Sequence, residues 1–150
     1  MRLEYFQMVD RVEEVVPAEG RIRAHATVPE TSTIFEGHFP GHPIMPGVLL
    51  IETMAQTSGY LLLALNKFER MPFLVEVRDA KLRSFVRPGT KLVVEARLEH
   101  DGSGFAITKA SIATEARAIA DAEIRFRTLA FPSPELEQMM RETAARIGLS

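Results

Sequence analysis

The feature that most constrains this sequence is an apolar stretch from residue 47 to about residue 67, which is long enough for one helix. Its hydrophobic side chains would point to nearly every side, and such a helix must be buried on most of them. Polar residues interrupt it, among them Glu52, Gln56, Thr57 and Ser58. A membrane-spanning segment would rarely contain so many polar residues, so the rest of the chain is expected to wrap around the helix.

Outside this helix, polar and apolar residues alternate as they do in half-buried strands. The stretches 21–28, 91–99 and 122–128 show the pattern most clearly. Short turns such as DGSG at 101–104 connect them, and short connections favour antiparallel pairing because parallel strands need a crossover helix. The sequence therefore predicts an α+β fold with five or six antiparallel strands wrapped around one long central helix.

The last twenty residues predict an extra C-terminal helix. Ser133 is a good N-cap, Pro134 a good first helical residue, and Gly148 a good terminator. Apolar and small side chains then form one stripe at helical spacing: Leu136, Met139, Met140, Thr143, Ala144 and Ile147. We expect a surface helix packed on the sheet or on a second subunit. Residues 1–131 would form the main domain, with 132–150 as its helical extension.

Composition excludes several classes of protein. The net charge of −2 argues against a nucleic-acid binder held by bulk electrostatics. Cysteine is absent, which rules out disulfides, thiolate metal sites and a cysteine nucleophile, and is compatible with a reducing cytosol. The first ten residues, MRLEYFQMVD, do not resemble a signal peptide. We expect a cytoplasmic protein that binds neither nucleic acid nor membrane.

The segment before the apolar helix, GHFPGHPIMPG at residues 37–47, holds three prolines, three glycines and two histidines. Proline fixes φ and glycine permits close backbone approach, so this loop is conformationally restricted. His38 is a candidate general base, since histidine titrates near neutral pH. The alternative is a histidine that only shapes a turn or the core. His38 and His42 are not expected to bind a metal, because a loop need not bring them to one face.

The start of the helix supplies two further chemical groups. The unpaired N–H groups at Gly47 and Val48 suit a polarised carbonyl oxygen. Glu52 and Gln56 lie one turn apart on the same face, so that Gln56 can orient Glu52 through a hydrogen bond. Glu52 is a candidate general acid because apolar surroundings favour a protonated carboxyl group, although it could instead simply reach solvent. A base, an acid and a carbonyl site together indicate proton transfer beside a polarised carbonyl.

The stretch GHFPGHPIMPGVLLIETMAQ, residues 37–56, closely resembles the signature of the (3R)-3-hydroxyacyl-acyl carrier protein dehydratases of the FabZ type, which have a hot-dog fold. The resemblance extends from about Tyr5 to Phe131. It implies that His38 is the catalytic histidine and Glu52 the catalytic glutamate. It also implies that the amide at Gly47 or Val48 binds the thioester carbonyl, and that the enzyme, a hydro-lyase, needs no cofactor and no metal.

The same resemblance implies partners. These are an acyl carrier protein with a phosphopantetheine-linked acyl chain, and a homodimer or a trimer of dimers in which each site takes its histidine from one chain and its acid from the other. Acyl carrier proteins are acidic, and four basic residues are candidates for docking: Arg78, Lys81, Arg83 and Arg87. The last three would share one face of a strand by period two. An ordinary solvated strand face is the alternative.

The sequence departs from the family pattern in three places. Residues 76–78 read Glu-Val-Arg where glycine is frequent, Thr90 stands where aspartate is usual, and the tail after Phe131 is extra. Three other functions stay open: a dehydratase of a specialised long-chain pathway such as lipid A synthesis, a hot-dog acyl thioesterase, and a non-catalytic acyl-binding subunit. Glutamate at position 52 favours simple dehydration, since the related dehydratase-isomerases usually carry aspartate there.

Overall fold

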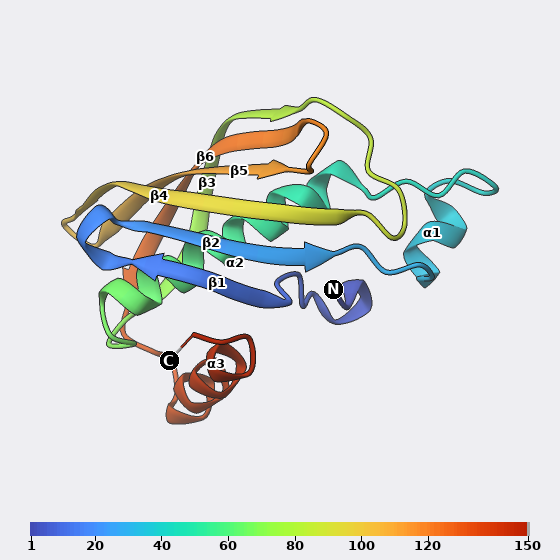
Figure 1. Cartoon of the computed structure of the whole chain (residues 1–150). Helices are drawn as coiled ribbons and strands as arrows, with labels where there is room; N and C mark the ends of the chain where they lie inside the picture. The colour runs from blue at the N-terminus through green and yellow to red at the C-terminus, as the bar shows by residue number, and fades with distance from the viewer. Residues whose placement is uncertain (150) are drawn as a thin grey trace.

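A computed structural model of the chain describes residues 1–149. All six strands pair antiparallel in one sheet, in the order β1-β2-β4-β5-β6-β3 (Figure 1). The strands are β1 (Arg11–Val16), β2 (Arg21–Thr27), β3 (Met71–Leu82), β4 (Lys91–Gly102), β5 (Phe105–Ala113) and β6 (Ala118–Leu129). The helices are α1 (Thr33–Gly37), α2 (Gly47–Leu65) and α3 (Pro134–Arg146), with short 3-10 turns at Leu3–Tyr5 and Pro17–Glu19. The predicted α+β architecture is confirmed.

Helix α2 is the centre of the core. The sheet curls around it and contacts it through every strand from β2 to β6 (Figure 1). By length and composition alone α2 could cross a membrane, but 61% of its apolar window is buried inside the protein, as in the core helix of a globular domain. Met54, Leu61 and Leu63 are among the fully buried side chains. The helix is therefore enclosed as its apolar sequence predicts.

The polar residues of α2 find partners within the core. The Thr53 hydroxyl donates to the carbonyl of Leu49 at 2.7 Å, and that of Thr57 donates to the carbonyl of Thr53 at 2.9 Å. Ser58 accepts a hydrogen bond from Thr108 of β5 at 2.8 Å. A buried hydroxyl group without a hydrogen-bond partner destabilises the folded protein. These bonds therefore explain how the buried helix tolerates Thr53, Thr57 and Ser58.

The strands show the predicted alternation. In β2, in β4 from Leu92 to Ala96 and in β6 from Ala120 to Thr128, every second side chain is buried and the intervening side chains are more exposed. The turn between β4 and β5 has positive φ at Ser103 and Gly104, which matches a tight hairpin. The pattern thus fixes which face of the sheet meets the helix.

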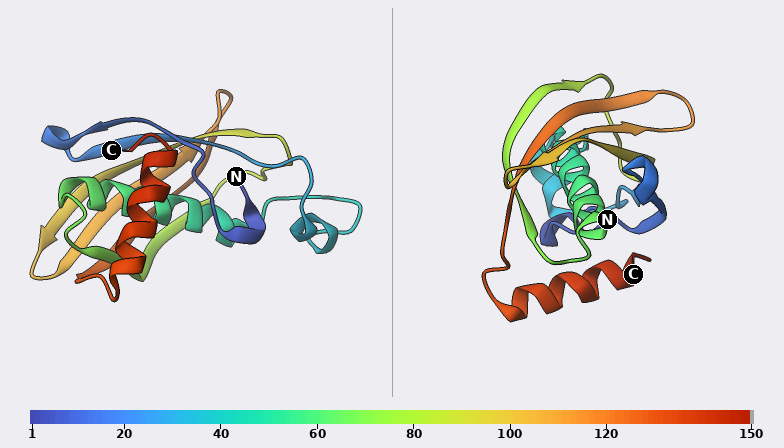
Figure 2. Two further views of the ribbon diagram at one scale, coloured as in Figure 1. Left: turned by 90° about the horizontal axis from the view of Figure 1, so that it is seen from below. Right: turned by 90° about the vertical axis from the view of Figure 1, so that its left-hand side faces the viewer.

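Helix α3 lies on the side of α2 that the sheet leaves open, and crosses it (Figure 2). Its cap is the predicted one, since Ser133 Oγ accepts the N–H of Leu136 at 3.2 Å and Pro134 is the first helical residue. Gly148, just beyond the helix, has a φ of +93°. Because α3 lies on the open side of α2, it covers α2 and does not lie on the outer surface of the sheet. The division into residues 1–131 and 132–150 stays a prediction.

Candidate active site

The His38 loop connects α1 to α2 and is tied by its own backbone. Phe39 and His42 exchange two hydrogen bonds of 2.8 and 2.9 Å, and the N–H of Ile44 donates to the His38 carbonyl at 3.0 Å. At the far end of the loop, Met45 N–H donates to the Val86 carbonyl at 2.7 Å. These bonds, together with three prolines, give the loop one defined path.

The His38 ring is held in an orientation that suits a base. Its Nδ1 lies 2.8 Å from the carbonyl oxygen of Ile44, and only a protonated Nδ1 can donate to a carbonyl. In that tautomer Nε2 carries the lone pair that accepts a proton. The ring is half-buried and stacks on Phe39, with 4.1 Å between ring centroids.

The first turn of α2 leaves two amide groups free. The N–H groups of Leu49 and Leu50 both donate to the Pro46 carbonyl. Within residues 1–149, no acceptor takes the N–H of Gly47 or Val48. A Cβ atom at Gly47 would collide with the end of the Leu82 side chain, so glycine lets the end of β3 approach the helix terminus. Two donors at a helix N-terminus suit an oxygen with partial negative charge.

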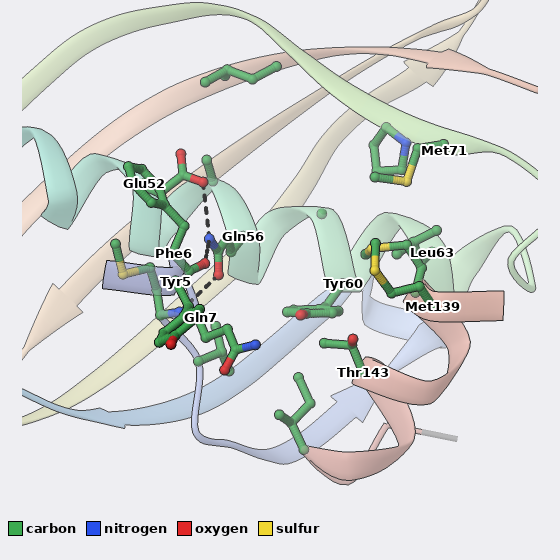
Figure 3. A pocket seen from close by; sticks show the side chains of 18 of the residues that line it. Tyr5, Phe6, Gln7, Glu52, Gln56, Tyr60, Leu63, Met71, Met139 and Thr143 are labelled. Atoms are coloured by element: carbon green, nitrogen blue, oxygen red, sulfur yellow. Dashed lines mark hydrogen bonds between the residues drawn. The ribbon is translucent and has the colours of Figure 1, made fainter. Parts of the chain in front are cut away.

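Glu52 is oriented by a neighbour one turn away. Gln56 Nε2 donates to Glu52 Oε1 at 3.0 Å (Figure 3). The same amide group donates to the carbonyl of Phe6 at 2.5 Å and accepts the N–H of Met8 at 3.1 Å. This role of the N-terminal segment could not be predicted from the sequence, because it rests on backbone atoms, which the pattern of side chains does not reveal.

Glu52 and Gln56 lie at one end of a pocket of about 600 Å³. The pocket follows one face of α2 past Tyr60 to Leu63, with walls from the N-terminal segment, the start of β3 and α3 (Figure 3). Burial raises the pKa of the Tyr60 hydroxyl, so this side chain is neutral at physiological pH. Most of the lining is apolar, and its size is typical of sites for small molecules.

A family model described as a FabA-like domain matches residues 2–123. The chain is 38% identical over 120 residues to the 3-hydroxyacyl-acyl-carrier-protein dehydratase FabZ of Ligilactobacillus salivarius, covering 79% of this chain and 85% of that protein. It is 39% identical to the FabZ of Clostridium acetobutylicum, covering 79% and 84%. The chain belongs to the FabZ-type dehydratase family.

Solved structures similar to this dehydratase support the hot-dog fold. A conserved protein of Pseudomonas aeruginosa matches with a TM-score of 0.66 at 18% identity, covering 84% of this chain and 91% of that one. A hypothetical thioesterase of Streptococcus pneumoniae, solved with coenzyme A, matches with a TM-score of 0.65 at 13% identity, covering 82% and 88%. The predicted hot-dog fold is thereby confirmed.

Within one chain of this dehydratase, the candidate base and acid do not share a pocket. His38 is not among the residues that line the Glu52 pocket. The segment between α1 and α2, which holds the His38 loop, projects beyond the end of the sheet (Figure 1). In the described part of the chain, no three His, Asp or Glu side chains gather as metal ligands would.

The prediction that three basic residues share one face of a strand was wrong. Strand β3 ends at Leu82, so Arg83 and Arg87 lie in the loop that follows. The register also shifts between Arg78 and Lys81, where Asp79 has a positive φ of 51° and forms a bulge. Alternation by period two does not continue through a bulge or past a strand end, and the residue types at Asp79 and Leu82 do not mark either one.

Two of the four basic residues are paired with carboxylates. Arg83 bonds Asp121 of β6 at 2.8 Å. Arg78 bonds Glu76 at 2.7 Å, and this hydrogen bond lowers the pKa of the Glu76 carboxyl group. Lys81 and Arg87 are exposed, and within residues 1–149 neither forms an ion pair. Their role in docking stays a prediction.

Proposed function

We propose that this FabZ-type protein removes water from (3R)-3-hydroxyacyl groups held on acyl carrier protein during fatty acid biosynthesis, forming the trans-2-enoyl thioester. The observation that most supports this proposal is that the chain belongs to this dehydratase family and has both His38 and Glu52. Glu52 lies at the end of an apolar pocket. Incubation of the protein with a (3R)-3-hydroxyacyl carrier protein should give a product lighter by one water, detected by mass spectrometry. Release of free carrier thiol instead would indicate a thioesterase.

The proposed mechanism uses two backbone N–H groups and two side chains. The thioester carbonyl oxygen accepts hydrogen bonds from the N–H groups of Gly47 and Val48, which stabilise the enolate charge as it develops. His38 Nε2 takes the proton from the carbon next to the carbonyl. Glu52 gives its proton to the hydroxyl group on the third carbon, the carbon–oxygen bond breaks, and water leaves as the double bond forms. A proton then returns from His38 to Glu52 through water, so both groups regain their starting states.

We further propose that each active site is shared between two subunits. His38 and Glu52 do not line one pocket within a chain, and the loop that carries His38 projects from the body of the domain (Figure 1). Each site would then combine His38 of one chain with Glu52 of the other. This arrangement agrees with the dimer that the family resemblance implies.

The free edge of β3 is the proposed dimer contact. Strand order places β3 at one edge of the sheet. Large apolar side chains there are exposed, including Val75 at 53%, and Phe85 just after the strand is 83% exposed. Val48 at the start of α2 is 71% exposed as well. An unpaired edge strand with exposed apolar side chains can pair with the same strand of a second chain. A two-fold axis between the two chains would make this contact self-complementary.

Arg83 and Arg87 are expected to matter for carrier-linked substrates. An acidic carrier protein is steered by nearby positive charge, so the double variant Arg83→Ala/Arg87→Ala should lower kcat/KM on the carrier-linked substrate by about tenfold at low salt. The difference should shrink as salt rises, since salt screens exposed charges. On short pantetheine thioesters, which lack the carrier protein, kcat/KM should be unchanged.

The matched control removes the same charge elsewhere. Arg97 and Lys109 are exposed register partners on β4 and β5. The variant Arg97→Ala/Lys109→Ala should keep the activity of the original protein on both substrates. Equal losses on carrier-linked and short substrates in the Arg83/Arg87 variant would show damage to the site or the fold and would reject a docking role.

A further inference from the structure

Helix α3 forms one wall of the Glu52 pocket. Four side chains of α3 line the pocket, Met139, Met140, Thr143 and Arg146, and Ile147 just after the helix lines it as well. The opposite wall belongs to α2, through Gln56, Tyr60 and Leu63. Helix α3 begins at Pro134, beyond residue 123 where the match to the family model ends, so this wall lies outside the matched part of the chain.

The two ends of the pocket differ in polarity. Glu52 and Gln56 lie at one end, beside Phe6, while Leu63, Met71 and Met139 lie together at the other (Figure 3). Tyr60 and Thr143 lie between them (Figure 3). A substrate with its hydroxyl group at Glu52 would therefore direct its hydrocarbon tail toward the methionines. Apolar lining at that end favours hydrocarbon over water.

The length of the pocket corresponds to a definite chain length. Glu52 and Leu63 are eleven residues apart on α2, which is about 16 Å along the axis at 1.5 Å per residue. An extended carbon chain advances about 1.25 Å per bond, as carbon–carbon bonds near 1.5 Å and angles near 111° require. The pocket thus accommodates about a dozen carbons beyond the hydroxyl-bearing carbon.

Helix α3 is anchored firmly enough to act as a fixed wall. The carbonyl of Ile147 accepts the N–H of Val12 at 2.7 Å, which joins the end of α3 to the edge strand β1. Ala144 is fully buried. Arg141 lies over the Phe68 ring, 5.1 Å from its centroid, and donates to the Phe68 carbonyl at 3.3 Å. Met139, by contrast, is 54% exposed, so a change there does not disturb the core.

We infer that α3 closes the far end of the acyl pocket and that Met139 limits the length of acyl chain the enzyme accepts. The occupant is the hydrocarbon tail of a long-chain 3-hydroxyacyl thioester, and the inference rests on the proposed dehydratase function. Met139 is a specificity-determining residue that touches the end of the tail. Longer tails would have to displace its side chain.

The test compares Met139→Ala and Met139→Trp over a series of (3R)-3-hydroxyacyl carrier proteins from short to long. The alanine variant should accept longer chains and the tryptophan variant only shorter ones. The ratio of kcat/KM for long against short substrates should rise about tenfold in the first and fall about tenfold in the second, the scale of one or two methylenes in a pocket. Gln138→Ala, an exposed neighbour outside the pocket, is the control and should keep the original profile.

A second measurement separates this inference from the proposed reaction. Calorimetry with a long-chain acyl-pantetheine measures occupancy of the pocket without chemistry, and Met139→Trp should weaken binding about tenfold. If no chain length is dehydrated but this loss of binding is seen, the reaction is wrong and the pocket assignment stands. If both Met139 variants keep the original length profile and affinity, α3 does not limit the acyl chain and the inference is overturned.

Discussion

His38→Ala and Glu52→Gln should each lower the rate of dehydration by about 10²–10⁴-fold, the usual contribution of one general acid or base. Alanine removes the Nε2 lone pair that takes the proton. Glutamine keeps the size and the hydrogen bond to Gln56 but has no acidic proton to give to the leaving hydroxyl group. The measurement is kcat/KM on a (3R)-3-hydroxyacyl carrier protein, with circular dichroism to confirm that both variants are folded.

Two variants in the same structural context serve as controls. His42 is exposed in the loop that holds His38, and Glu69 is exposed just beyond α2. His42→Ala and Glu69→Gln should stay within a few-fold of the original activity. Should Glu52→Gln retain most of its activity, Glu52 would be a structural residue held by Gln56, and the assignment of the acid would fail.

Mixing the two inactive proteins should restore activity. If each site takes His38 from one chain and Glu52 from the other, a mixed dimer of His38→Ala and Glu52→Gln subunits has one site with both groups intact and one site with neither. Random exchange makes half of the dimers mixed, so recovery should approach about a quarter of the original activity. The measurement is dehydration after subunit exchange, induced by mild denaturant and dilution.

Subunit exchange must be shown independently, by native mass spectrometry of differently tagged chains. Each variant mixed with itself is the control and should stay inactive. Mixed dimers that form without any recovery would place His38 and Glu52 in the site of a single chain and would refute the shared site.

The fold could be predicted from the sequence because its two strongest patterns are local. An apolar helix such as α2 must be enclosed, and alternation in β2, β4 and β6 fixes which side chains face it. Prediction from local pattern failed where strand β3 is irregular. The bulge near Asp79 and the end of β3 at Leu82 removed the expected basic strand face, and neither has a clear residue signal.

The candidate site was predictable to the extent that it rests on side chains in one segment. His38, Glu52 and Gln56 lie within twenty residues of sequence, so spacing and residue type identify them. The contacts that span the chain were not predictable. Phe6 and Met8 contact Gln56 through backbone atoms, and α3 reaches the pocket from the far end of the sequence. Such contacts depend on tertiary packing and not on local pattern.

The amide group of Gln56 joins two parts of the protein that would otherwise be independent. One of its hydrogen bonds holds the carboxyl group of Glu52, and two others fasten the backbone at Phe6 and Met8. The backbone at Phe6 and Met8 therefore acts as a brace for the acid, and detachment of this segment would free Gln56 to rotate and leave Glu52 unsupported. Loosening of this segment should consequently lower the activity even though His38 and Glu52 are both still present.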